Sequence, residues 1–293
     1  MTRDVTALLA FCEGSHDVAF VRRVLRSCLN FEKVDWRFSE FPSPLNSLFK
    51  ANVNRHAAQD LSLDMAHKFY LPDHVLRRDD RVVLLFNSGG KTKWNQTRNF
   101  LGEYLDLLDQ AQTFPGDAGT VVAKSLVLFL YDADSDGPEQ IRNQLKLQFS
   151  NIGERSWLAS GWKPDPDNAV AATASDIASY VWCGDDGVGT LEDLLIPIHR
   201  LSDAKRAGEA ERCLDGLFQW ETGHDIAIRR IAERARRSKA VITLLGQREK
   251  PGMSQHVMIG QTQTMKEGDF VSDGRVTAFA GFVARFLGLE VSA

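Results

Sequence analysis

Acidic residues follow two strongly apolar runs of this 293-residue chain, at the points where the runs end. Glu13 comes directly after "ALLAFC", and Asp132 and Asp134 come after "SLVLFLY". Side chains two residues apart in extended backbone point the same way, so Asp132 and Asp134 are expected to act together. Carboxylates held close together repel one another unless a cation neutralises them, and such oxygen-rich sites favour Mg²⁺ or Mn²⁺. The pattern predicts a site for one or two of these ions, with Glu13 as a ligand or as a base beside one.

Two further acidic residues are weaker candidates for the same site. Asp17 lies four residues after Glu13, one turn into a predicted helix, and a solvated position on that helix is the alternative. Asp136 is the last acid of "DADSDG", which also matches the start of a calcium loop. The twelfth position of that loop is Asn143 instead of Glu, which disfavours calcium. Taken singly, each of these acids would more often make a turn or cap a helix.

The elements that must position these residues are short strands of a parallel sheet. Continuous apolar runs at 7–11, 82–86 and 125–131 predict strands that are covered on both faces, and "IASYVW" at 177–182 is a plausible fourth. Turn residues and an amphipathic helical pattern follow each run. The predicted fold is therefore α/β, with a parallel sheet flanked by helices. The loops after the strands meet at one edge, where ligands bind in such folds.

The predicted organisation is an α/β domain over 1–200 and a mostly helical extension packed on it over 201–293. Residues 31–80 interrupt the strand–helix repeat, and their spacing predicts a mostly helical insertion. Four cysteines lie far apart with no CxxC pair, which favours a reduced, cytoplasmic environment. No apolar run is long enough to cross a membrane.

The order of acidic motifs resembles the Toprim domain, in which a Glu ends the first strand and a DxD motif ends a later one. The matching stretches are "EGSHDVAFVRRVL" and "LFLYDADSDG". The chain is most similar to the Toprim nucleases of the OLD (overcoming lysogenization defect) family and their small relatives without an ATPase. That resemblance makes Glu192 and Asp193 of "GVGTLEDLLIPI" the counterpart of a later acidic motif. It implies a Toprim fold and a two-metal phosphodiesterase, with these two residues at the second metal.

The larger OLD proteins carry an ATPase that is not evident here. "NSGGKTK" fails the phosphate-loop pattern, because Leu85 stands where a glycine is required six residues before Lys91. The glycines of this stretch could still bring backbone amides and Lys91 to a substrate phosphate, and a plain turn is the alternative. The resemblance makes a separate ATPase partner and a role in defence against phage plausible expectations.

A basic stretch near the end of the chain is the candidate contact for a nucleic-acid backbone. The formal charge of -4 gives no overall attraction, but residues 229–250 hold eight basic residues against two acidic ones. Within this stretch Lys239 is the candidate for the negative charge that develops on a reacting phosphate, and Arg236, Arg237 and Lys250 are candidates for binding. A solvated helix face is the alternative.

The predicted function is a metal-dependent endonuclease that hydrolyses phosphodiester bonds in DNA or RNA. A Toprim-fold nucleotidyl transferase is one alternative, and a non-catalytic nucleic-acid-binding regulatory subunit is another.

Overall fold

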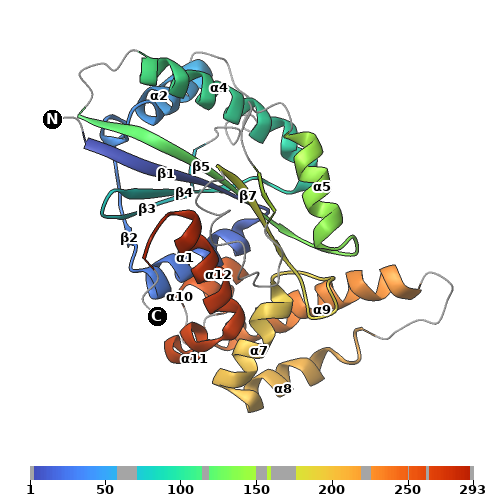
Figure 1. The fold of residues 1–293 in the computed structure, drawn as a ribbon. Coiled ribbons are helices and arrows are strands. Elements are labelled where there is room, and N and C mark those ends of the chain that lie inside the picture. Colours follow the sequence, from blue (N-terminus) through green and yellow to red (C-terminus); the bar gives the residue numbers. More distant parts are fainter. Residues whose placement is uncertain are drawn as a thin grey trace.

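The structure is a computed structural model of the chain, and it is a three-layer α/β fold (Figure 1). It describes residues 3–57, 71–113, 119–149, 157–159, 176–218, 226–249, 251–261 and 264–290. The α/β class with a mostly parallel sheet flanked by helices is confirmed. None of the helices in these ranges is long and apolar enough to span a bilayer.

The described strands form one sheet of seven, in the order β2-β3-β4-β1-β5-β7-β6. Their bounds are β1 Arg3–Cys12, β2 Glu32–Lys33, β3 His74–Arg78, β4 Arg81–Asn87, β5 Thr120–Asp132, β6 Trp157–Ala159 and β7 Ile177–Trp182. β1 pairs in parallel with β4 on one side and with β5 on the other, and β7 continues the parallel set. The four strands expected from the apolar runs are therefore neighbours at the centre of the sheet.

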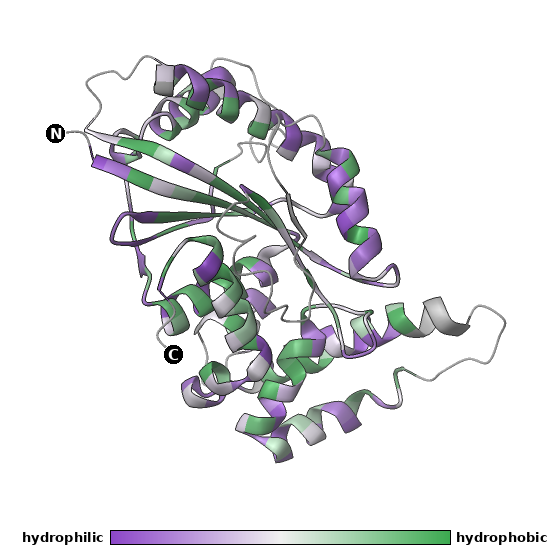
Figure 2. Cartoon of the chain, in the orientation of Figure 1, coloured by the Kyte–Doolittle hydropathy of each residue, from purple (hydrophilic) through white to green (hydrophobic). Residues whose placement is uncertain are grey.

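Helices cover both faces of this sheet, as Figure 1 shows. One face, called here the α1 face, packs on α1 Ser15–Leu29, α7 Glu192–Ser202, α8 Ala204–Leu214, α9 Ile226–Glu249, α10 Gln255–Gln261, α11 Glu267–Ser272 and α12 Gly274–Phe286. The other, the α4 face, packs on α2 Leu45–Ala57, α4 Trp94–Thr113 and α5 Pro138–Gln148. The central strands are mostly hydrophobic, whereas α5 is largely hydrophilic (Figure 2).

Alternation along each strand explains why both faces are apolar. In β1, Leu8 and Ala10 belong to the core of the α1 face, while Leu9 and Phe11 belong to that of the α4 face. All four side chains are at most 1% exposed. A strand that must fill two cores has no polar position, and this is why it appears in the sequence as an unbroken apolar run.

The late helices complete the core of the α1 face. Phe279 of α12 makes edge-to-face contacts with Tyr180 and Trp182 of β7, with ring centroids 4.9 and 4.8 Å apart. Arg23 of α1 donates hydrogen bonds to the carbonyl oxygens of Ile259 and Met265, at 3.1 and 2.8 Å, and so joins α1 to the chain around α10 and α11. α12 is thus packed directly on the sheet.

The described part of segment 31–80, residues 31–57 and 71–80, differs from the mostly helical insertion that was expected, and residues 58–70 lie outside the described ranges. It contains α2, but β2 and β3 also lie in it, and they add two antiparallel strands to the sheet beside β4. Only Val75 and Leu76 are buried in β3, one in the core of each face. A five-residue strand with two buried residues gives a weak apolar signal.

Candidate active site

Glu13 lies where β1 ends, next to the end of β5. Its Oε2 accepts a hydrogen bond from the backbone N–H of Asp132, at 3.0 Å. β4 and β5 lie on either side of β1. The chain leaves β1 through α1 on one face of the sheet on its way to β4, and it passes from β4 to β5 through α4 on the other face. The carboxyl end of β1 is therefore a topological switch point, the usual place for a ligand in an open α/β sheet. Burial raises the pKa of Glu13, and the Asp132 amide and Lys91 offset part of that rise.

Asp17 faces the same point from the first turn of α1. Its Oδ2 accepts a hydrogen bond from the Gly14 N–H at 2.9 Å, so the side chain also caps the helix. Its Oδ1 is buried and has no hydrogen-bond partner. Burial, followed by the nearby charges of Glu13 and Glu192, raises the pKa of Asp17 to about 8. The alternative of a solvated helix position is wrong, because the residue is only 5% exposed.

Asp132 and Glu192 bring two more carboxylates to this edge. Asp132 Oδ1 accepts the Leu191 N–H at 2.8 Å, and burial together with Asp17, Glu192 and Glu13 raises the pKa of Asp132 well above its usual range. Glu192, 1% exposed at the start of α7, accepts a hydrogen bond from Gln255 Nε2 at 2.9 Å through its Oε1. Its Oε2 is buried without a partner.

Glu192 differs from the other acids in its electrostatic environment. Burial raises its pKa, but His16, Lys239 and Thr190 lower it by more, so the net pKa lies below the ordinary value. The His16 Nδ1 lies 3.6 Å from Glu192 Oε1. Glu192 therefore holds a negative charge next to acids that resist ionisation.

These four acids, Glu13, Asp17, Asp132 and Glu192, are called the carboxylate group below. They come from two strand ends and two helix starts, and each of the first three is perturbed by the charge of at least one other acid. As they stand, no three His, Cys, Asp or Glu side chains within the described ranges are placed closely enough to ligate one ion. The four carboxylates thus lie near one another, but their present positions do not form a complete set of ligands around one ion.

Asp134 does not join the carboxylate group, contrary to expectation. β5 ends at Asp132, and Asp134 has a left-handed backbone with φ of 48° instead of an extended one. Its backbone exchanges hydrogen bonds with Gly189, and its carboxylate pairs with Lys91 Nζ at 2.6 Å. Its charge still raises the pKa values of Glu13 and Lys239, so Asp134 lies beside the carboxylate group. Asp136, also predicted as a ligand, is exposed in the same turn.

The glycines before Lys91 form a turn. The Gly90 N–H donates to the Glu13 carbonyl oxygen at 2.9 Å, and the Gly89 N–H donates to Asn87 Oδ1 at 3.1 Å. Both amides are therefore already used inside the protein. This supports the plain-turn alternative and leaves Lys91 as the partner of Asp134 rather than as a free phosphate contact.

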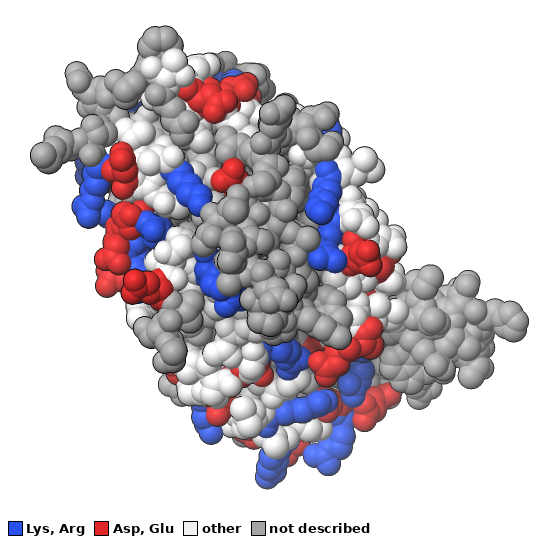
Figure 3. Space-filling view, in the orientation of Figure 1, with Lys and Arg blue, Asp and Glu red and all other residues white. Residues whose placement is uncertain are grey.

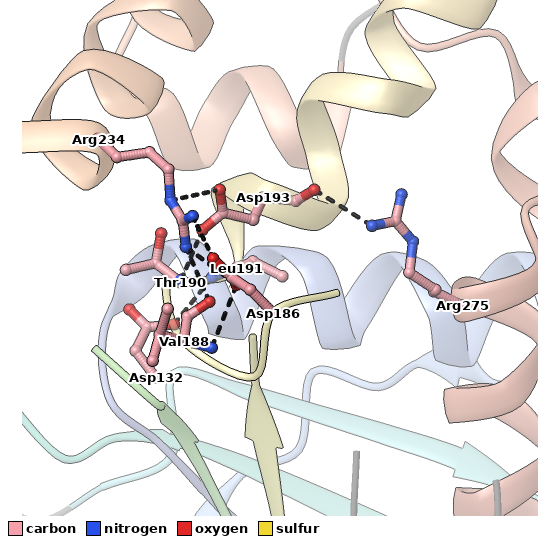
Figure 4. Close-up of polar contacts among 8 residues, drawn as sticks. All are labelled: Asp132, Asp186, Val188, Thr190, Leu191, Asp193, Arg234 and Arg275. Carbon is pink, nitrogen blue, oxygen red and sulfur yellow. Dashed lines mark hydrogen bonds and ion pairs between the residues drawn. The ribbon is translucent and has the colours of Figure 1, made fainter. Parts of the chain in front are cut away.

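Asp193 is turned away from its neighbour Glu192 and belongs to a different cluster, drawn in Figure 4. Its Oδ2 accepts the Thr190 N–H at 2.9 Å, and its Oδ1 lies 3.5 Å from Arg234 Nε. Arg234 also donates to Asp186 Oδ2 at 2.7 Å and to the Val188 carbonyl at 2.9 Å. Successive helix residues point about 100° apart, so one of the pair faces the carboxylate group and the other faces α9. The expected role of Asp193 as a ligand is not supported by this geometry.

This second cluster fixes the loop before α7. Arg234 of α9 contacts three parts of the segment 186–193, and that segment supplies the Leu191 N–H that binds Asp132. Gly189 has φ of 109°, and a Cβ there would lie 2.1 Å from Asp193 Oδ2. The loop therefore requires glycine at this position. We call Arg234 with Asp186 and Asp193 the loop latch.

Lys239, in the middle of α9, is the cation of the site. Desolvation lowers its pKa, but the charges of Glu192, Asp132, Asp17 and Asp134 raise it by more, so the net pKa is above its usual value. The residue stays accessible to solvent. A lysine that neighbours the carboxylate group and still reaches solvent is suited to meet a bound anion, and its catalytic role stays a prediction.

The other predicted basic contacts have different outcomes. Arg236 is exposed, whereas Arg237 donates to Asp215 Oδ1 at 2.6 Å and to the Glu211 carbonyl, so it joins α9 to α8. Lys250 lies outside the described residues. On the face in Figure 3, the described Lys and Arg side chains are interspersed with Asp and Glu. That view gives no single-sign surface over the residues drawn in colour.

His16 and Gln255 belong to the site but were not predicted. Both contact Glu192 Oε1. His16 stands beside Asp17 in "EGSHD", which was a local signal that it could face the same edge. Gln255 is 63 residues from Glu192 along the chain, and only the packing of α10 places it there.

Comparisons with known proteins give little further information. No family model matches the chain, and no curated protein matches it. One solved structure that resembles it is a hypothetical protein, PH0156, from Pyrococcus horikoshii OT3. That protein shares 14% identity with a TM-score of 0.45, over 97% of this chain and 95% of the other.

Proposed function

We propose that this protein is a Mg²⁺- or Mn²⁺-dependent phosphodiesterase that cleaves nucleic acid. The observation that carries the proposal is the carboxylate group, in which Glu13, Asp17, Asp132 and Glu192 meet at the switch point of the sheet. Buried acids that perturb one another are costly to a fold without a partner, and they concentrate at functional sites.

The chemistry of the donor set supports a hard divalent cation. Every acid of the group offers carboxylate oxygens, the ligands that Mg²⁺ and Mn²⁺ prefer. Asp17 Oδ1 and Glu192 Oε2 are buried and have no hydrogen-bond donor within the part of the chain that the structure describes, which leaves both able to accept a cation. Such an ion, when bound, would polarise the phosphate and supply a nucleophilic water. Glu13, Asp17, Asp132 and Glu192 are the residues that would hold it.

The remaining residues have roles that follow from their contacts. The Asp132 N–H binds one carboxylate oxygen of Glu13, and the Leu191 N–H binds one carboxylate oxygen of Asp132. The orientation of both acids is therefore fixed before substrate arrives. Lys239 is the group to meet the negative charge that builds up on the phosphate. His16 lies 3.6 Å from Glu192 Oε1, close enough to help hold that acid in place.

The experiment is a cleavage assay on single- and double-stranded DNA and RNA, with Mg²⁺ or Mn²⁺. Glu13→Gln and Asp132→Asn should each reduce the rate at least about 100-fold, the scale of losing a preorganised charged group. Asp106→Asn, an exposed acid on α4, is the matched control and should cleave at the wild-type rate. Titration calorimetry with Mn²⁺ gives a second readout, and both site variants should bind it more weakly than the control.

Two results would overturn the proposal. One is cleavage at the wild-type rate by Glu13→Gln and Asp132→Asn. The other is a wild-type protein that neither binds Mn²⁺ nor cleaves any of the four substrates, which would favour the non-catalytic alternative. The assay is repeated with candidate ATPases, because dependence on a separate ATPase and a role in defence stay predictions.

A further inference from the structure

Two hollows lie side by side along α1, and Arg22 lines both of them. The larger, of about 750 Å³, is formed by the second half of α1 with the start of β2 and with α10 and α11. The smaller, of about 370 Å³, is formed by the first half of α1 with the start of β3 and with α10. The two hollows, which share Arg22 as a lining residue, are together called here the α1 groove.

One end of the groove lies at the first turn of α1. Its lining includes Ser15, Ala19, Arg22 and Arg26, which recur at helical spacing along one side of α1. Asp17 belongs to the same first turn but lies on the other side of the helix, since successive residues point about 100° apart. By the rise of an α-helix, Arg22 lies roughly 7.5 Å beyond Asp17 along the axis, and Arg26 about 6 Å further. The groove therefore starts in the turn of α1 that also holds one of the acids.

Arg22 and Arg26 are the groove cations that have no acidic partner among the described residues. Arg22 Nη1 contacts His74 Nε2 at 3.1 Å, and a Cβ on Gly260 would lie 2.6 Å from its Nη2, so the guanidinium is held between β3 and α10. Arg26 is exposed one turn further along the helix. Burial and then the neighbouring Arg26 lower the pKa of Arg22. Two like charges at this spacing destabilise a helix, and an anion between them would remove that cost.

The other charged groups of the groove are already engaged. Arg23 pairs with Glu267 at 3.2 Å, and Lys33 pairs with Asp35 at 2.7 Å. Asp73 accepts a hydrogen bond from the Asn87 N–H at 2.7 Å. Glu32 is exposed at the rim, where solvent screens it. The net attraction inside the groove is therefore for a negative ligand.

We propose that the α1 groove binds the phosphate backbone of a single nucleic-acid strand, with one end of the bound segment at the first turn of α1. The proposal rests on the proposed function and adds a substrate class to it. Hollows of this size enclose a few small chemical groups, which fits one strand rather than a duplex. Arginines four residues apart on a helix place their Cβ atoms about 6 Å apart, so each can contact a different phosphate.

The test is a binding measurement that does not depend on cleavage. Fluorescence anisotropy in EDTA compares labelled single-stranded and duplex DNA and RNA, with the wild type and the Arg22→Ala/Arg26→Ala variant. The wild type should prefer single strands, and the variant should bind them at least about tenfold more weakly, since two phosphate contacts are lost. The slope of log K against log salt should fall in magnitude by about 1.4, at roughly 0.7 for each contact.

The matched control is Arg98→Ala/Lys146→Ala, which removes the same charge from exposed positions on α4 and α5, on the other face of the sheet. Arg26→Glu is a second variant that cannot fail through misfolding of the groove, because Arg26 is exposed. It should weaken binding at least as much as Ala at this position.

The outcomes separate the groove from the proposed function. Binding by the groove variants equal to that of the control, or a wild type that prefers duplexes or binds no single strand, would overturn the groove. A wild type that binds single strands through Arg22 and Arg26, yet cleaves nothing with Mg²⁺ or Mn²⁺, would leave the groove standing and refute the phosphodiesterase.

Discussion

The backbone N–H of Asp132 donates a hydrogen bond to the side chain of Glu13, with 3.0 Å between the Asp132 nitrogen and Glu13 Oε2. The ladder between β1 and β5 runs to Cys12 opposite Leu130, so this contact extends the pairing of the two strands by one side chain. The acid that is proposed to act in catalysis thus also holds the end of β5 in place.

This contact predicts different stabilities for two inactive variants. Glu13→Gln keeps an oxygen that accepts the Asp132 N–H and removes a charge from the carboxylate group. Glu13→Ala leaves that N–H without its acceptor, which costs about 1 kcal/mol or more. Urea denaturation at pH 7.5 should therefore rank Glu13→Ala below Glu13→Gln, while both fail to cleave. Equal free energies of unfolding for the two would show that the contact contributes nothing.

Asp17 predicts that the metal-free protein loses stability as the pH rises. The pKa of Asp17 is about 8 in the folded protein against 3.8 for the ordinary group, so the folded state binds more protons between these values. The stabilisation from protonated Asp17 is complete below about pH 4 and is lost as the pH passes 8. Denaturation in EDTA from pH 5.5 to 8.5 should show this slope.

The matched variant is Asp17→Asn, which keeps an oxygen for the Gly14 N–H. It should flatten the slope and stabilise the metal-free protein at pH 8.5 by at least about 1.4 kcal/mol, the equivalent of one pKa unit. It should also abolish the rise in Tm that Mn²⁺ gives the wild type. A slope that persists unchanged in Asp17→Asn would assign the titration to another group.

Lys239 should affect the rate of cleavage more than metal binding. Lys239→Met removes the cation that neighbours Glu192, Asp132 and Asp17, and kcat should fall by about 100- to 1,000-fold if the ammonium group stabilises the transition state. Mn²⁺ affinity, measured by calorimetry, should be equal or slightly higher, because a competing positive charge is gone. Lys239→Arg should recover part of the rate, and Lys205→Met on α8 serves as the exposed control. A loss of rate that matches a loss of Mn²⁺ affinity would contradict this role.

The loop latch predicts that one arginine outside the carboxylate group controls the position of Asp132. Arg234→Gln removes contacts to Asp186, Asp193 and the Val188 carbonyl, and it leaves the half-buried Asp193 without its counter-charge. The free energy of unfolding should fall by about 1–3 kcal/mol, and cleavage should slow because the Leu191 N–H shifts. Asp186→Asn breaks only the exposed part of the latch and should cost below about 1 kcal/mol. Equal effects of the two substitutions would show that the buried half does not matter.

The central sheet was predictable because its strands are buried on both faces. Continuous apolar runs mark β1, β4, β5 and β7, and parallel pairing then places Glu13 and Asp132 at one edge. β3 was not predicted, because His74–Arg78 has only one buried residue on each face, Val75 and Leu76, beside two arginines. Such a short strand depends on its neighbours more than on its own composition.

Within the site, sequence spacing failed where the backbone leaves regular geometry. Asp134 was expected to point with Asp132, but one residue with positive φ turns it toward Lys91. Glu192 and Asp193 were expected as a pair, but a helix separates adjacent side chains, and only Glu192 faces the acids. The contact between Arg237 and Asp215 could not be predicted from the sequence, because it depends on the packing of α8 on α9.

The edge-to-face packing of Phe279 on Tyr180 and Trp182 has a consequence for synthesis on the ribosome. Translation delivers β1, β4, β5 and β7 well before α12, which begins at Gly274. Until α12 has emerged from the exit tunnel, the side of the β7 aromatic residues that Phe279 later covers remains open to water and to other nascent chains. The nascent protein therefore exposes an apolar surface to aggregation or to chaperones for the time taken to translate about 90 residues beyond β7, several seconds at ordinary elongation rates.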